Sequence, residues 1–168
     1  MGFMGAGKST LSHKLAHYCN ATSYDIDIYI AHKHRQSVSE IFQTHGQEYF
    51  REKETEVLRQ FVSEKEPHIV SCGAGIVESK DNIDLLKGEF VLFLDVPALE
   101  GAHRITNPKT RPLLADMAKV SELEEKRRPL YEQIASARLD VSGKVPHEAF
   151  LSAVDLLEKE GVICRLQK

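Results

Sequence analysis

Short apolar runs alternate with amphipathic stretches along most of the chain, a pattern typical of parallel strands joined by crossover helices. The runs "HIVSC" at 68–72 and "FVLFLDV" at 90–96 predict buried strands, and "ARLDV" at 137–141 predicts a last strand. Apolar residues at helical spacing predict a helix that begins near Lys8 and a closing helix over about 146–160. We therefore expect an α/β fold in one domain that covers residues 1–168.

The segment between the first helix and "HIVSC" predicts one strand and an interrupted helix. "ATSYDID" at 21–27 is interpreted as a strand that ends in the acids Asp25 and Asp27. In "SVSE", Ser37 and Glu40 have the spacing of a capping box, so a helical region begins there. It pauses at Gly46 and continues as a longer helix over about 47–63.

The stretch "TNPKTRPLLAD" at 106–116 has neither helical nor strand periodicity, and it contains two prolines. A segment of this length without regular structure is often a loop that closes over a ligand. We predict a mobile lid over about 105–117.

Composition and charge narrow the class of protein. A net charge of -3 at pH 7 gives no field that would attract nucleic acid or an anionic membrane. The three cysteines lack C-x-x-C spacing, so they predict neither a disulfide framework nor a zinc site. No apolar run approaches the length of a membrane span. We expect a cytoplasmic protein without nucleic-acid or membrane partners.

The most specific motif is a phosphate-binding loop from Gly2 to Ser9, "GFMGAGKS", with the pattern G-x-x-x-x-G-K-[ST]. In such a loop, backbone N–H groups and a helix N-terminus bind phosphate oxygens. Lys8 would reach the β and γ phosphates, and the Ser9 hydroxyl would bind Mg²⁺. The expected nucleotide-binding residues are Gly5, Ala6, Gly7, Lys8, Ser9 and Thr10.

Two acidic or paired clusters are candidates for binding the phosphoryl acceptor. Asp25 and Asp27 follow a predicted strand, where ligands gather in open α/β sheets, so one could face a metal and the other a hydroxyl group. They could equally be turn or N-cap residues of the next helix. Arg51 and Glu54 are three residues apart on a helix, either as an oriented functional arginine or as a solvated pair.

Two further clusters have the same ambiguity. "CGAG" at 72–75 follows a predicted strand and either offers backbone N–H groups to a ligand or makes a tight turn. "KRRPLY" offers Arg127 or Arg128 for an anion, unless this is an exposed basic helix turn. None of the four clusters decides the function alone.

In combination, the motifs resemble those of the shikimate kinase family over essentially the whole chain. The matching segments are "GFMGAGKST", "DIDIYI", "SVSEIFQTHGQEYFREKE", "GAG", "VLFLDVP", "KTRPLL" and "RRPLY". The resemblance implies a three-layer P-loop kinase with a five-stranded parallel sheet of order 2-3-1-4-5. It also implies a monomer that uses ATP and Mg²⁺ to phosphorylate the 3-hydroxyl of shikimate, an early step toward chorismate and the aromatic amino acids.

The resemblance also implies roles for individual residues. Asp27 would bind the shikimate diol and accept the 3-hydroxyl proton, while Asp25 would lie on the Mg²⁺ side with Ser9. Arg51 and Arg127 would grip the substrate carboxylate, since a guanidinium makes paired charged hydrogen bonds. The substrate-binding helices would span about 27–63, and Arg128 would be a surface residue. The remaining roles fall to Phe50 as apolar wall, Glu54 as support for Arg51, Gly73, Ala74 and Gly75 as backbone donors, Arg111 on the ATP phosphates, and Arg104 on adenine.

The chain departs from the family pattern at two places. The family usually has three glycines where this chain has Gly73-Ala74-Gly75, and we expect Ala74 to keep φ below zero, because a positive φ would strain it. The family also has a short apolar strand before the phosphate loop, in the centre of the sheet. We expect Met1 to be an internal methionine that is preceded in the natural protein by roughly five to eight mostly apolar residues.

Two other functions compete with this interpretation. A related small kinase for another polyol acid, such as gluconate, would share the loop and the general fold; the set of Asp27, Arg51 and Arg127 argues against it. A degenerate kinase domain acting as a nucleotide-binding regulator would lack catalysis; the presence of Lys8, Ser9, Asp27 and Arg111 argues against that.

Overall fold

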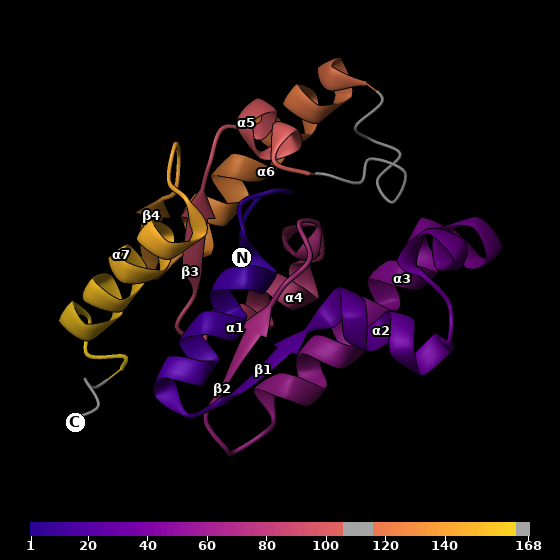
Figure 1. The fold of residues 1–168 in the computed structure, drawn as a ribbon. Coiled ribbons are helices and arrows are strands. Elements are labelled where there is room, and N and C mark those ends of the chain that lie inside the picture. The colour runs from indigo at the N-terminus through magenta and orange to yellow at the C-terminus, as the bar shows by residue number, and fades with distance from the viewer. Residues whose placement is uncertain (106–115, 164–168) are drawn as a thin grey trace.

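The computed structural model describes residues 1–105 and 116–163. The strands are β1 (Thr22–Asp25), β2 (His68–Ser71), β3 (Leu92–Asp95) and β4 (Ala137–Asp140). The helices are α1 (Lys8–Cys19), α2 (Ile26–His34), α3 (Val38–Val62), the 3-10 turn η1 (Ile76–Glu78), α4 (Lys80–Leu86), α5 (Ala98–His103), α6 (Met117–Ile134) and α7 (Pro146–Lys159). This alternation confirms the predicted α/β class (Figure 1).

The strands form two parallel pairs. β1 pairs with β2 so that Asp25 lies opposite Ser71, and β3 pairs with β4 so that Asp95 lies opposite Asp140. β1 and β2 therefore end side by side, and open α/β sheets bind their ligands at the carboxyl ends of their strands. Within the described residues, β2 and β3 are joined by no ladder of their own.

Helices cover both faces of the strands. One apolar cluster joins α1 and α7 to Leu94 of β3 and Leu139 of β4, and a second joins α3, α4 and α6 to Phe93. Because side chains alternate along a strand, adjacent Phe93 and Leu94 enter opposite clusters. The strands thus lie between two helical layers, and β3 is largely buried, as its apolar run predicted, whereas β1 and β4 contain exposed residues.

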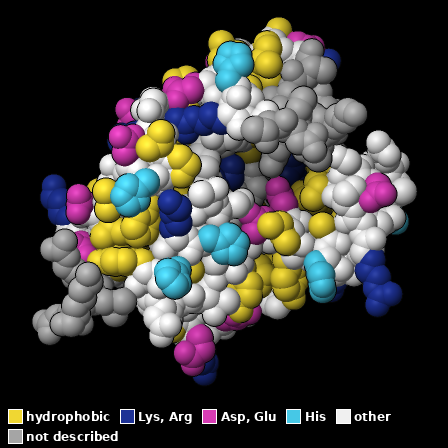
Figure 2. Space-filling model, in the orientation of Figure 1, with side chains coloured by type: hydrophobic (Ala, Val, Ile, Leu, Met, Phe, Trp, Pro, Cys, Tyr) yellow, Lys and Arg dark blue, Asp and Glu magenta, His cyan; other side chains and the backbone are white. Residues whose placement is uncertain are grey.

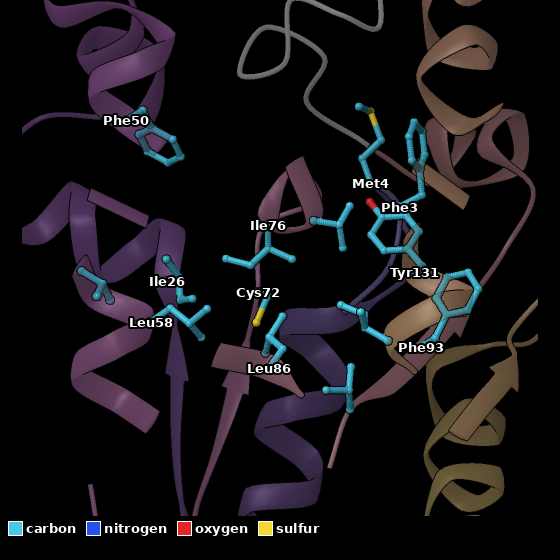
Figure 3. Packing of buried hydrophobic residues seen from close by; sticks show 14 of the residues in the cluster. Phe3, Met4, Ile26, Phe50, Leu58, Cys72, Ile76, Leu86, Phe93 and Tyr131 are labelled. Carbon is cyan, nitrogen blue, oxygen red and sulfur yellow. The ribbon is translucent and has the colours of Figure 1, made fainter. Parts of the chain in front are cut away.

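The second cluster, shown in Figure 3, holds the elements that surround the site. Ile26 and Leu58 lie on one side of Cys72 and Ile76, and Phe93 and Tyr131 lie on the other. Burial raises the pKa of the Cys72 thiol to about 11, which makes this cysteine a packing residue rather than a reactive one.

A cavity of about 540 Å³ lies between β2 and β3. Its lining includes Ile69 and Val70 of β2, Leu92 and Leu94 of β3, and Met1. The Met1 amine donates a 2.8 Å hydrogen bond to the Leu92 carbonyl, and Leu94 N–H donates one of 2.9 Å to the Met1 carbonyl. Met1 and Gly2 thus run parallel to β3 at one end of this cavity.

Several local predictions are confirmed, and one boundary is wrong. Ser37 and Glu40 form the predicted capping box, and Gly46 interrupts α3 with φ 85° and ψ 173°. The strand predicted at 21–27 is shorter, because β1 ends at Asp25 and α2 begins at Ile26. Asp27 consequently lies in the first turn of α2 rather than at a strand end. In the described ranges 1–105 and 116–163, we find no helix with the length and apolarity of a membrane span.

Candidate active site

The glycine-rich loop leads directly into α1 in the geometry of a phosphate-binding loop. Gly7 is the N-cap residue of α1 with φ 85°, and no side chain caps this helix end. The first N–H groups of α1 therefore need partners from outside the helix, and a phosphate supplies acceptors for them. Lys8 lies against the loop, where its ammonium donates a 2.9 Å hydrogen bond to the Phe3 carbonyl.

Gly5 and Gly7 are required for different reasons. Gly5 has φ 74°, and a Cβ there would overlap the backbone carbonyl of Gly101 in α5. A Cβ on Gly7 would meet nothing within 4 Å, so this position faces open space. Gly5 therefore allows the loop to pack against α5, whereas Gly7 is needed for its positive φ of 85°.

The N-cap interpretation of Asp25 is confirmed, and its side chain also contacts the phosphate loop. One carboxylate oxygen accepts a 3.2 Å hydrogen bond from Ile28 N–H, so Asp25 is the N-cap of α2. The other accepts a 2.6 Å hydrogen bond from the Ser9 hydroxyl. The strand end and the phosphate loop are thereby joined at the two side chains predicted to lie on the metal side.

A cavity of about 180 Å³ brings the phosphate loop and the acceptor candidates together. It is lined by Gly5, Gly7, Lys8, Ser9, Thr10, Asp25, Asp27, Ser71, Cys72, Gly73 and Ala74. Figure 2 shows acidic and basic side chains gathered in a hollow of the surface beside the α2 and α3 region. Segments from the N-terminal loop, α2 and the turn after β2 therefore share one hollow.

The turn after β2 depends on glycines because side chains of the site fill the space beside it. A Cβ on Gly73 would lie 2.6 Å from Glu54 Oε1 and 2.7 Å from Asp27 Oδ1. A Cβ on Gly75 would overlap the guanidinium of Arg51. Among the described residues only Asn20 and Arg35 are non-glycines with positive φ, so Ala74 keeps φ below zero as expected.

The two predicted carboxylate-binding arginines lie close together and share a partner that the sequence analysis missed. Arg51 of α3 donates to Glu54, and its Nε lies 3.1 Å from Glu78 Oε2. Arg127 of α6 donates to Glu78 Oε1 through Nε at 3.1 Å and Nη2 at 2.7 Å. No local signal marks Glu78, since its partners are separated from it by 27 and 49 positions in the chain.

Burial dominates the electrostatics at Glu54, whose side chain is 0% exposed. It raises the pKa of Glu54 to about 7; Arg51 opposes this rise, and the charges of Asp27 and Glu78 add to it. Glu54 thus binds the Arg51 guanidinium, and near neutral pH its carboxyl group is only partly ionised.

Apolar and backbone groups complete the acceptor side. Phe50 is 2% exposed and stacks on Phe42, and the Arg51 guanidinium carbon lies 5.9 Å from the Phe50 ring. The Tyr131 hydroxyl donates to the Ala74 carbonyl, which fixes the turn after β2 against α6. Phe50, the expected apolar wall, therefore lies beside the guanidinium of Arg51.

Arg128 and Arg104 lie apart from this group. Arg128 was expected to be a surface residue, but it is half-buried and ion-paired with Asp95 at 2.7 Å and Glu124 at 2.5 Å. Consecutive helix positions point about 100° apart, which directs Arg128 away from Arg127. Arg104 ends α5 and donates to Glu100 and to the Val141 carbonyl at 2.7 Å. Arg111 lies outside the described residues.

The residues at the loop fit magnesium bound together with a nucleotide. Searching only the described ranges, we find no group of three or more His, Cys, Asp or Glu side chains arranged to hold a metal by themselves. Mg²⁺ usually takes one or two protein oxygens and completes its octahedron with water and substrate phosphates. The hydrogen-bonded Ser9 hydroxyl and Asp25 carboxylate supply such oxygens beside the phosphate loop.

A phosphate loop at the N-terminus of α1, parallel strands between helical layers, and two arginines joined by Glu78 beside the turn after β2 are features of a small P-loop kinase. The family model described as shikimate kinase matches residues 4–158. Among curated relatives, the shikimate kinase of Rhodococcus jostii is 38% identical over 149 residues, covering 87% of this chain and 88% of the relative. That of Aquifex aeolicus is 33% identical over 163 residues, covering 96% and 94%.

Solved structures agree with the sequence relatives. The structure of shikimate kinase from Acinetobacter baumannii in complex with shikimate superposes with a TM-score of 0.87 at 28% identity, covering 95% of this chain and 90% of that one. The chain belongs to the shikimate kinase family. Its activity is ATP-dependent phosphoryl transfer to a hydroxyl group of shikimate, with Mg²⁺, in the pathway of aromatic amino acid biosynthesis.

Proposed function

We propose that the described hollow carries out this reaction, with ATP on the loop of residues 2–9 and shikimate between α2, α3, η1 and α6. The single observation that supports this placement is the 180 Å³ cavity, which Lys8 and Ser9 share with Asp27 and Gly73. Phosphoryl transfer between two bound substrates requires the donor and acceptor sites to open into each other. The two proposed sites meet this requirement because residues of both line the same cavity.

On the acceptor side, Asp27 hydrogen-bonds the diol and takes the proton of the 3-hydroxyl as it attacks the γ-phosphorus. Its position in the first turn of α2 places the carboxylate beside the turn after β2, on the wall of the shared cavity. Arg51 and Arg127 bind the carboxylate at the other end of the shikimate ring, with Phe50 as apolar support. Gly73, Ala74 and Gly75 offer backbone groups between these two ends.

On the donor side, positioning and charge compensation do most of the work, because the transferred phosphoryl group needs little covalent help from protein. Gly5, Ala6, Gly7 and Thr10 line the backbone cradle, and Lys8 turns from the Phe3 carbonyl onto the phosphates. Ser9 and Asp25 would hold Mg²⁺ on its protein side, and the bound ion would supply positive charge that offsets the negative charge of the phosphates.

The lid keeps its proposed role over about 105–117. Arg111 contacts the ATP phosphates when the lid closes, and Arg104 stacks on adenine. The observed bonds of Arg104 to Glu100 and Val141 place it at the end of α5, which leads into this segment. An Arg111→Ala variant is expected to lose turnover while keeping shikimate affinity.

We further propose that β1 to β4 belong to one five-stranded parallel sheet, in the order β1, β2, a central strand, β3, β4. The cavity between β2 and β3 supports this, because the Met1 backbone already exchanges hydrogen bonds with β3 at one end of it. An extended apolar segment ending at Met1 would pair with both flanking strands.

The comparison that tests this sheet uses the chain as given and the chain extended by the codons directly upstream of Met1. The extended protein is expected to unfold at a temperature at least about 5 °C higher, since each kcal/mol shifts the midpoint of a domain of this size by roughly 2 to 4 °C and the added strand contributes several hydrogen bonds. Equal melting temperatures would contradict the central strand.

The remaining proposals concern the protein as a whole. We expect a monomer, to be measured by light scattering during size exclusion, with neither nucleic acid nor membrane as partner. A cytoplasmic location is supported by Cys19 and Cys72, which are both free thiols.

The experiment for the acceptor measures ADP release from MgATP with shikimate, with gluconate and without acceptor. ADP formation that depends on shikimate, with a matching phosphorus signal of shikimate 3-phosphate, is expected. Turnover with gluconate at a similar rate would contradict the acceptor assignment. ATP binding without turnover on any acceptor would instead favour a nucleotide-binding regulator.

A further inference from the structure

Among the described residues, Glu78 is the one acidic residue that contacts both arginines of the proposed carboxylate clamp, the pair Arg51 and Arg127. Its Oε1 accepts two hydrogen bonds from Arg127, at 3.1 and 2.7 Å. Its Oε2 lies 3.1 Å from Arg51 Nε, whose N–H is not directed at it, so this second contact is an ion pair. A single carboxylate thus connects α3 to α6.

Glu78 is itself fixed in place. It is the last residue of η1, and its N–H donates a 3.0 Å hydrogen bond to the Gly75 carbonyl. The neighbouring Ile76 and Val77 are fully buried, and the buried Asn82 side chain donates a 3.1 Å hydrogen bond to the Ile76 carbonyl. The 3-10 turn is therefore anchored to the core, and its terminal carboxylate has little freedom to move.

Arg127 needs such a partner because its side chain is only 6% exposed. A buried guanidinium without a countercharge is strongly disfavoured, and the described residues provide Glu78 as its carboxylate. Arg51 is 21% exposed and has Glu54 as a second partner. Glu78 is thus more important for the position of Arg127 than for that of Arg51.

The geometry leaves the clamp able to bind substrate while Glu78 stays in place. A guanidinium carries five N–H donors, and Glu78 takes only two from Arg127, both from its Nε edge. The donors of Nη1 and the second donor of Nη2 remain for a ligand carboxylate. A substrate can therefore bind in addition to Glu78, and need not displace it.

We propose that Glu78 is a positioning residue for shikimate binding, which holds Arg127 and Arg51 side by side so that both face one carboxylate. This inference rests on the proposed roles of the two arginines. The opposite possibility is that Glu78 occupies the clamp as a competitor. The two possibilities predict opposite changes in shikimate binding when Glu78 is replaced. Loss of a positioning residue weakens substrate binding, and loss of a competitor strengthens it.

The test is steady-state kinetics of wild type, Glu78→Ala and Glu78→Gln. We expect Glu78→Ala to raise KM for shikimate about tenfold, the loss associated with one charged contact, with KM for ATP within twofold and kcat within threefold. Glu78→Gln is expected to show a smaller rise, of about threefold, since its amide oxygen still accepts from Arg127. If the alanine variant does not fold, the glutamine variant alone decides.

A matched control is available on α6. Glu122 is an exposed glutamate that pairs with Lys126 at 2.6 Å, on the same helix as Arg127. Glu122→Ala removes the same charge from the same helix and is expected to leave both KM values unchanged. An equal rise in KM for shikimate in Glu78→Ala and Glu122→Ala would show that loss of any nearby negative charge has this effect, and would overturn the positioning role of Glu78.

A second readout separates positioning from a general structural role. In an Arg127→Ala background, Glu78→Ala should add less than a threefold further rise in KM for shikimate, because its main partner is already absent. Fully multiplicative effects would overturn the proposal, as would an unchanged or lower KM for shikimate in Glu78→Ala. Absence of shikimate-dependent turnover in wild type would instead overturn the proposed function on which it rests.

Discussion

The proposed donor and acceptor sides of the site are built in opposite ways. The phosphate loop is one contiguous stretch, Gly2 to Ser9, whose backbone makes the site. The acceptor side is assembled from side chains of α2, α3, η1 and α6, whose functional residues lie as far apart as positions 27 and 127. The first depends on local backbone geometry, whereas the second depends on the whole fold and on the charge pairs within it.

This difference has an energetic counterpart. A backbone cradle at a helix N-terminus contributes fixed partial charges and remains in place without a ligand. The acceptor side places three carboxylates and two guanidiniums within a partly buried network, in which the state of each group depends on the others. Substitutions on the acceptor side should therefore change shikimate binding and stability together, and leave ATP binding largely intact.

The largest expected effect is on the chemical step. Asp27→Asn removes the proposed proton acceptor while keeping the size of the side chain, and kcat should fall about 10³-fold, within the range for general base catalysis. ATP affinity should be unchanged in the same preparation. The exposed Asp84, paired with Lys87, serves as the control position. An Asp27→Asn enzyme with near wild-type kcat would remove Asp27 from the mechanism.

Next in size is the pH dependence of stability at Glu54. Its pKa is about 7 in the folded protein against an ordinary value of 4.5, so between these values the folded state holds more protons than the unfolded state. The stability due to Glu54 is fully present below pH 4.5 and is lost as pH rises through 7, by about 3 kcal/mol at 1.36 kcal/mol per pKa unit.

Denaturant unfolding of wild type and Glu54→Gln at pH 5, 6, 7 and 8 measures this loss. The glutamine variant cannot ionise, so its stability relative to wild type should increase over this range. Parallel pH profiles for the two proteins would show that Glu54 titrates normally and that the acceptor network is not coupled as described.

A somewhat smaller effect distinguishes the two neighbouring arginines. Arg127→Ala should weaken shikimate binding about 30-fold, since truncation of a buried charged partner costs about 2 kcal/mol or more. ATP binding should change by less than threefold. Arg128→Ala, whose ion pairs go to Asp95 and Glu124, should leave both affinities near wild type. Equal losses for both ligands in Arg127→Ala would contradict its assignment to the acceptor side.

The smallest expected effect concerns glycine spacing in the turn after β2. Gly75→Ala would push the new Cβ into the Arg51 guanidinium and displace it, raising KM for shikimate about tenfold, or 1.4 kcal/mol. Gly88→Ala is the matched control, because a Cβ there meets only the Leu85 carbonyl, at 3.9 Å. If both variants keep wild-type KM, the turn adapts without moving Arg51.

The sequence predicted most of the fold because the fold is locally encoded. Capping at Ser37, the break at Gly46 and the apolar runs of β2 and β3 each lie within a few residues of the feature they cause. The predicted end of β1 was two residues too late, because the periodicity of the sequence does not show that Asp25 is the N-cap of α2.

The acceptor network could be predicted only in part. Arg51 and Arg127 were named through the family resemblance, but Glu78 had no local pattern to mark it, because its partners come from other helices. The burial of Arg128 against Asp95 was missed for the same reason. Charge pairs between distant segments depend on packing, which single-sequence periodicity does not contain.

A crystal structure of the complex with ADP, Mg²⁺ and shikimate tests the central claim most directly, since it shows which end of shikimate faces which side of the hollow. The account predicts the shikimate carboxylate on both Arg51 and Arg127, with Glu78 still bonded to Arg127, and the 3-hydroxyl on Asp27 and directed at the loop that holds ADP. Shikimate bound with its carboxylate away from this clamp, or with its 3-hydroxyl directed away from the loop, would contradict the account.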